Sequence, residues 1–195
     1  MQSDRVIGKR VIVAVTGASG AIYARLTLQR LIECESVAHI ALVCSDTAKQ
    51  TVAFECEQLP LHEKIEQFDN HNLFADAASG SARYDAMIVV PCSAGTLARI
   101  ANGISQTLIE RAADVMLKER RPIVAVLREA PYSLIHLRNM EALTAAGGVI
   151  VPASPSFYSR PSTIEEVCMT VVERALAQAG IDTPHFEWRG RNDSL

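Results

Sequence analysis

Short, almost unbroken apolar runs alternate along this chain with longer segments in which apolar residues recur every three or four positions. The apolar runs, rich in β-branched residues, lie at residues 11–15, 40–44, 86–90, 123–127 and 148–151. Runs of this kind predict strands that are buried on both faces, as in a parallel sheet. The segments with helical spacing are residues 21–34, 47–55, 95–100, 107–120, 133–145 and 164–179.

This alternation predicts an α/β fold: a doubly wound, Rossmann-like open parallel sheet with flanking helices, whose ligands bind outside the carboxyl ends of the strands. Two polar stretches, residues 59–81 and 152–161, interrupt the alternation and are predicted to be loops. Ser162 and Glu165 predict a capping box before the last helix. We expect one domain over residues 1–195, with an ordered core at about 9–180 and an aperiodic tail at 181–195.

Composition narrows the class of protein. The 195 residues are 49% hydrophobic, which is enough for a substantial core, and the net charge of −3 gives no footprint for nucleic acid. No apolar run approaches the roughly 20 residues that span a bilayer, and the first residues lack the apolar stretch of a signal peptide. The five cysteines have no CxxC spacing. We therefore expect a cytoplasmic protein without disulfides, metal, membrane or nucleic-acid partner.

The turn after the first predicted strand, residues 16–21, reads TGASGA. Its glycines permit close backbone approach, and the helix that follows favours an anion at its start. A dinucleotide fingerprint would need a third glycine near Tyr23 and an acid at the tip of the second strand, where this chain has Ser45. An NAD-binding oxidoreductase is therefore disfavoured, while a plain strand–helix turn stays open on this motif alone.

Two further strand ends repeat the theme. Ser45 and residues 91–96, PCSAGT, place hydroxyls and N–H groups at helix starts, although a lone serine there is usually only a helix cap. Three such ends on one sheet edge favour a phosphate or ribityl site. Arg128 and Glu129 follow the fourth strand, where an arginine can fork onto a phosphate, and a surface ion pair is the equal alternative.

Other candidates are weaker on the residues alone. Arg111 and Lys118 lie seven apart and so share a helix face, where most such pairs are solvated. Arg174 falls at the edge of the apolar stripe of the last helix, where a long side chain reaches a neighbouring cleft. Glu55 reads equally well as an exposed acid, and Tyr158 as a loop anchor.

The combined motifs resemble those of the UbiX-type flavin prenyltransferases. They are, in order, TGASGA, the serine after the second strand, ASGS, PCSAGTL, ERAADVMLKERRP, REAP, HLRNM and FY-x-x-P, and the resemblance runs over about residues 11–179. The related flavin-dependent cysteine decarboxylases carry P-A-S-A-N-T in place of PCSAGT and use a histidine after the first helix, where this chain has none before His39. Such a decarboxylase is the alternative enzyme, and a flavin-binding accessory subunit without catalysis is the alternative from another class.

The resemblance implies a set of site residues. The contacts to FMN carry over to Gly17, Ala18, Ser19, Ser45, Ser93, Ala94, Gly95, Thr96 and Arg128. The phosphate of the second substrate, dimethylallyl phosphate, would be bound by Arg111, Lys118, Glu129, Tyr158 and Arg174. Ser19, Glu55 and Glu129 are the expected catalytic residues, with Glu55 matching the acid near the flavin ring.

The resemblance also implies the reaction and the assembly. Reduced FMN is a substrate, no metal takes part, and prenylated FMN is the product, which serves as the cofactor of UbiD-type decarboxylases. The site lies between subunits of a trimer, and four trimers form a homododecamer. The sequence leaves open whether a monophosphate or a pyrophosphate is the preferred prenyl donor.

Overall fold

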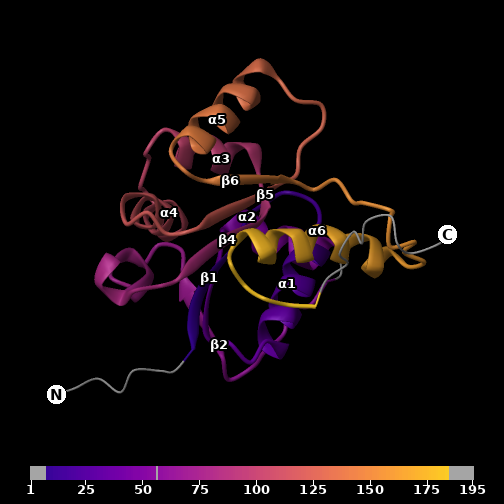
Figure 1. Ribbon diagram of the computed structural model, residues 1–195. Helices are drawn as coiled ribbons and strands as arrows, with labels where there is room; N and C mark the ends of the chain where they lie inside the picture. The colour runs from indigo at the N-terminus through magenta and orange to yellow at the C-terminus, as the bar shows by residue number, and fades with distance from the viewer. Residues whose placement is uncertain (1–7, 56, 185–195) are drawn as a thin grey trace, which may run out of the picture.

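The computed structural model describes residues 8–55 and 57–184, and within them the chain forms one parallel sheet (Figure 1). Its strands are β1 Lys9–Val15, β2 Val37–Cys44, β3 Ile65–Asp69, β4 Ala86–Cys92, β5 Ile123–Leu127 and β6 Val149–Pro152. They lie in the order β3-β2-β1-β4-β5-β6, and every neighbouring pair is parallel. This arrangement confirms the predicted doubly wound α/β fold.

Helices cover both faces of the sheet (Figure 1). They are α1 Ala21–Glu33, α2 Asp46–Phe54, α3 Ala94–Ala101, α4 Leu108–Lys118, α5 Leu134–Ala145 and α6 Ile164–Gln178, with short 3-10 turns at η1 Asp76–Ala78 and η2 Gly80–Ala82. Side chains of β1 alternate between two cores: Val13 packs with α1 and α6, whereas Ile12 packs with α3 and α4. Both faces of β1 are therefore buried, as its unbroken apolar run predicts.

The strand β3 corrects the prediction of a loop over residues 59–81. It pairs with β2 through Ile40↔Ile65 and Val43↔Phe68, and it forms the edge of the sheet. Only Ile65 and Phe68 of its five residues are even partly buried. An edge strand is covered on fewer sides than a central one, so it needs no continuous apolar run, and its sequence IEQFD gives little strand signal.

The switch in strand order lies between β1 and β4, and a buried hydroxyl joins the two strand ends there. Thr16 Oγ1 donates to the carbonyl of Pro91 over 2.7 Å and accepts from the N–H of Ser93 over 2.8 Å. Open α/β sheets bind their ligands at such a switch point, outside the carboxyl ends of the strands. The loops after β1, β2, β4 and β5 therefore define the edge of the molecule where a site is expected.

The two ends of α6 differ slightly from the prediction. The N-cap is Thr163, whose side chain accepts from the N–H of Glu166, so the capping box is one residue later than the predicted pair Ser162 and Glu165. Past the helix, Ile181 is 1% exposed and belongs to the core, so the packed chain continues beyond the predicted limit near residue 180. The rest of the predicted tail, residues 185–195, lies outside the described residues. Within residues 8–55 and 57–184, no helix is both long and apolar enough to cross a bilayer.

The corrected cap gives a direct stability test. Thr163→Ala removes the acceptor for the first turn of α6, so we expect the free energy of unfolding to fall by about 1 kcal/mol in urea denaturation. Ser162→Ala is the matched control and should have less than half that effect, because the exposed Glu166 carboxylate that loses the Ser162 hydroxyl still accepts from the backbone N–H groups of Ser162 and Thr163. An equal or larger effect of Ser162→Ala would return the cap to the predicted position.

Candidate active site

Three helices begin at the carboxyl edge of the sheet, directly after β1, β2 and β4. Ser45 caps α2 by accepting from the N–H of Ala48 over 3.1 Å, and Ser93 caps α3 by accepting from the N–H of Thr96 over 3.2 Å. The first N–H groups of a helix have no partner within the helix, and the helix dipole makes this end positive. The edge therefore offers donors for an anionic ligand at α2 and α3.

The start of α1 is different, because a carboxylate of the protein already occupies it. The N-cap Gly20 has φ 105°, which favours glycine, and it offers no side chain to cap the helix. Instead the side chain of Glu55 accepts from the N–H of Gly20 over 2.9 Å and from that of Ala21 over 2.7 Å. Glu55 lies just past the last residue of α2 as its C-cap, so the predicted helical position is off by one residue.

The surroundings of Glu55 favour its ionised form. Partial burial raises the pKa of this carboxyl, but hydrogen bonds from the Ser19 hydroxyl and the two backbone N–H groups lower it more. The positive charge of Arg128 acts in the same direction. The net result is a pKa below that of an ordinary glutamate, so Glu55 is a carboxylate at neutral pH. The structure thus brings together Ser19, Glu55 and Arg128, which sequence reasoning had placed near one ligand.

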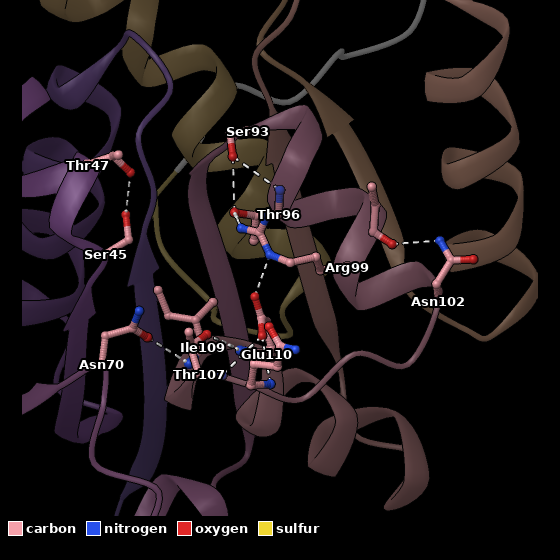
Figure 2. A network of polar contacts seen from close by, with 12 residues as sticks. Ser45, Thr47, Asn70, Ser93, Thr96, Arg99, Asn102, Thr107, Ile109 and Glu110 are labelled. Atoms are coloured by element: carbon pink, nitrogen blue, oxygen red, sulfur yellow. Dashed lines mark hydrogen bonds and ion pairs between the residues drawn. The ribbon is translucent and has the colours of Figure 1, made fainter.

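A pair of hydroxyls lies beside the opening turn. The Oγ atoms of Ser45 and Thr47 are 3.1 Å apart and point toward one another (Figure 2). A β-carbon on Gly17 would clash with the Thr47 side chain, so this glycine is what lets the turn approach α2 closely. Sequence reasoning missed Thr47, because a threonine in the first turn of a helix gives no signal of its own beyond the serine cap before it.

The residues after β5 lie at the same edge. The N–H of Arg128 donates to the carbonyl of Cys92 at the end of β4, and the arginine side chain is exposed. Glu129 accepts from the N–H of Ala130 over 3.0 Å and is partly exposed. Both side chains therefore lie at a strand end that faces the expected ligand crevice, although no contact joins Glu129 to the Glu55 group.

Arg174 lines a cavity of about 330 Å³ between the loop after β6 and helix α6. The same cavity is lined by Ser154, Ser156 and Ser159 of that loop, and Tyr158 between them is 71% exposed. A guanidinium beside three serines is suited to bind an anion. Glu173 also lines the cavity, so the positive charge is partly offset there.

The chain does not bring Arg111 and Lys118 to these residues. Arg111 pairs with Asp114 over 2.6 Å and donates to the carbonyl of Ala78. Lys118 ends α4 and pairs with Glu119 over 2.6 Å, at the amino edge of the sheet where β5 begins. Since Glu129 of the predicted phosphate clamp follows the opposite, carboxyl end of β5, the clamp is split between the two edges of the sheet.

Comparison with known proteins identifies the family. The flavoprotein family matches residues 2–177. The flavin prenyltransferase UbiX of Methanocaldococcus jannaschii is 39% identical over 184 residues, covering 91% of this chain and 97% of that protein. A crystal structure of AnUbiX (PadA1) in complex with FMN and dimethylallyl pyrophosphate is 40% identical with a TM-score of 0.83, covering 93% of this chain and 100% of that one.

The chain belongs to the UbiX-type flavin prenyltransferases, within the flavoprotein family. The resemblance drawn from the ordered motifs is thereby confirmed. A third relative, the dodecameric FMN-dependent UbiX-like decarboxylase of Escherichia coli O157:H7, is 41% identical with a TM-score of 0.85, covering 93% of this chain and 100% of that one.

The position of His39 separates this chain from the cysteine decarboxylases. His39 lies in β2 and contacts Tyr84 over 3.3 Å beside Arg10, near the start of the strands and away from the ligand edge. It is therefore not placed as the active-site histidine of the cysteine decarboxylases. Within residues 8–55 and 57–184, no group of three His, Cys, Asp or Glu side chains is arranged to hold a metal ion.

The contacts of Glu55 predict a pH-dependent stability difference. A group whose pKa is depressed in the folded state stabilises the fold above its unfolded pKa, and this contribution is lost as the pH falls through the folded pKa. Glu55→Gln should therefore lower the free energy of unfolding by about 1 kcal/mol at neutral pH and by progressively less in acid. Glu35→Gln, which changes an exposed carboxylate between α1 and β2, is the control and should have little effect at any pH. A pH-independent deficit in Glu55→Gln would show that its ionised form is not what holds α1.

Proposed function

We propose that this chain transfers the dimethylallyl group of dimethylallyl phosphate to reduced FMN and releases prenylated FMN. Membership in the UbiX-type family supports this reaction, as does the related structure that holds FMN together with dimethylallyl pyrophosphate. The observation that carries the proposal to this chain's own residues is the group formed by Ser19, Glu55 and Arg128 at the carboxyl edge of the sheet.

The flavin is bound across the ends of β1, β2 and β4. Because Glu55 fills the N-terminus of α1, the phosphate of FMN is bound by the helix starts of α2 and α3, through Ser45 and the backbone N–H groups of Ala94 and Gly95. The side chains of Ser93 and Thr96 lie beside this phosphate and contact the rest of the flavin. The flavin then contacts the backbone of Gly17, Ala18 and Ser19. The Arg128 side chain contacts the flavin from the loop after β5. Two anions cannot share one helix start, so this assignment places the flavin ring, not its phosphate, near Glu55.

The bound reduced flavin supplies the nucleophilic ring atoms that capture the allylic group. Glu55 accepts the proton that is removed on ring closure, a role that needs the ionised carboxylate its neighbours stabilise. The Ser19 hydroxyl donates to that carboxylate and orients it. Glu129 exchanges a proton with the prenyl phosphate. Arg174 and Tyr158 bind the departing phosphate, where fixed positive charge stabilises a developing anion without a metal.

Arg111 and Lys118 complete the phosphate clamp from a second copy of the chain. Lys118 lies at the opposite sheet edge from Glu129, so one chain cannot direct both at the same phosphate. Leu134, Ile135 and Leu137 on α5 are 62%, 68% and 49% exposed, and only Leu143 of this helix is buried. Exposed apolar residues in such a group are typical of a protein interface. The dodecameric relative supports a trimer-based dodecamer.

The product is proposed to serve a UbiD-type decarboxylase. This recipient follows from the family resemblance. Prenylated FMN is a modified cofactor that this chain releases as its product, so a second enzyme is expected to bind it. The transfer replaces a proton of the reduced flavin by the prenyl group and releases phosphate, so the flavin is neither oxidised nor reduced overall.

Product mass tests the proposed reaction directly. Anaerobic incubation of the protein with reduced FMN and dimethylallyl phosphate should give a flavin that is heavier by one five-carbon prenyl unit, as mass spectrometry measures. A parallel reaction with the pyrophosphate decides which donor is preferred. Glu55→Gln should bind FMN but fail to complete the new ring, because the carboxylate base is absent. Recovery of unmodified FMN with both donors would refute the transferase activity.

Mixed oligomers test whether two copies build the clamp. Lys118→Ala and Arg174→Ala alone should each lower the single-turnover rate by about 10²–10³, since each removes a donor at the leaving phosphate. If the two residues come from different subunits, random co-assembly of these variants restores both in about a quarter of the sites. Activity should then recover to about a quarter of the native value.

The matched control mixes Lys118→Ala with Arg111→Ala. Both changes fall on α4 of the donating subunit, so no combination of chains rebuilds a complete site and activity should stay low. Absence of recovery in the Lys118 and Arg174 mixture, with mixed oligomers verified by two affinity tags, would mean that each chain supplies its own clamp.

A further inference from the structure

A chain of side-chain contacts joins the start of α3 to the start of α4 (Figure 2). The Ser93 hydroxyl donates to Thr96 Oγ1 over 3.0 Å, and Nη2 of Arg99 donates to the same oxygen over 3.2 Å. Nε of Arg99 in turn donates to a carboxylate oxygen of Glu110. The family motifs give no role to Arg99, which lies on the exposed side of α3.

Glu110 holds this arginine from a buried position. Its side chain is 3% exposed, and its second oxygen accepts from the N–H of Gln106 over 2.8 Å and from that of Thr107 over 3.0 Å. The carboxylate is therefore fully bonded by the protein and has no need of a ligand. A buried carboxylate requires a partner charge, and Arg99 supplies it.

The need of Glu110 for a positive charge does not explain the second contact of Arg99. The guanidinium is planar, so once Nε faces Glu110 the direction of Nη2 is fixed as well. That direction leads to Thr96, which is 4% exposed. Nη1 lies 3.4 Å from where a β-carbon on Gly95 would be. Arg99 itself is 44% exposed. Its contacts place it between the buried Glu110 and Thr96 at the start of α3.

These contacts determine whether the Ser93 hydroxyl donates to a ligand or accepts a hydrogen bond from it. Thr96 Oγ1 accepts from both Ser93 and Arg99, so the Ser93 proton is directed inward. Ser93 Oγ also accepts from the N–H of Thr96, which leaves one lone pair toward the partly exposed side. Toward a ligand, Ser93 is then an acceptor. It suits a hydroxyl donor and does not suit a phosphate oxygen.

We propose that Arg99, held by Glu110 and acting through Thr96, sets the Ser93 hydroxyl as an acceptor for a hydroxyl of the ribityl chain of FMN. Arg99 is thus a positioning residue for flavin binding. The inference rests on the proposed function, because it requires that FMN lies at the start of α3.

The main variant must remove Arg99 without leaving a charged group buried. Arg99→Met with Glu110→Gln does this, since the glutamine oxygen still accepts from the N–H groups of Gln106 and Thr107 just before α4. Losing one neutral hydrogen bond to the ligand should raise the Kd for FMN about 3- to 10-fold. In turnover assays the KM for FMN should rise by the same factor while kcat at saturating FMN stays unchanged. Arg30→Met, which removes a partly exposed arginine from an ion-paired position on α1, is the control and should change neither.

A double-mutant cycle separates positioning from a general structural role. Thr96→Val is nearly isosteric and removes the hydroxyl through which Arg99 acts. Adding Arg99→Met with Glu110→Gln to Thr96→Val should then raise the Kd no further, since the pathway is already broken. If the two effects multiply, or if the variant lacking Arg99 binds FMN as the native protein does, the proposal is wrong.

Arg99→Lys is a second variant that tests the proposal even if the main variant fails to fold. The lysine keeps a positive charge beside Glu110, but one ammonium cannot reproduce the fork that reaches both Glu110 and Thr96. It should fold and still bind FMN more weakly, and native affinity in this variant would overturn the proposal. The native protein is titrated with FMN first: failure to bind would refute the proposed function itself, whereas native binding with unaltered variants would refute only the role of Arg99.

Discussion

The hydrogen bonds from the N-terminus of α1 to the Glu55 carboxylate set the layout of the ligand edge. Gly20 brings the chain around in a left-handed conformation but offers no cap, so the helix start depends on a residue from the end of α2. This contact ties the turn after β1 to the unit formed by β2 and α2. It also gives the protein an ionised carboxylate beside Ser19 and Arg128, and it closes one of three helix starts to any other anion.

The remaining features of the edge follow from the parallel sheet. Every strand ends at the same side, so Ser45, Ser93 and Arg128 gather there although they are far apart in the sequence. Thr16 fixes the ends of β1 and β4 at the switch point, and Arg99 links the start of α3 to the buried Glu110. The opposite edge carries Lys118, and this separation is the physical reason to expect a site built from two copies.

The sequence predicts the central part of the fold well because burial on both faces leaves an unbroken apolar run, as in β1, β4 and β5. It misses β3 because an edge strand needs no such run. It also predicts the local caps Ser45 and Ser93, whose partners are three residues away. It cannot predict the bond between Glu55 and Gly20 or the pair of Arg99 and Glu110, because no local pattern specifies contacts made between separate elements. Arg111 and Lys118 illustrate the same limit, since their shared helix face says nothing about which end of the sheet each one reaches.

A crystal structure of this protein with FMN tests most directly that α1 is reserved for Glu55. The account predicts that the carboxylate still accepts from the N–H groups of Gly20 and Ala21, with the flavin phosphate within hydrogen-bonding distance of the first residues of α2 or α3. A phosphate oxygen bonded to Gly20 and Ala21, with Glu55 displaced, would contradict it.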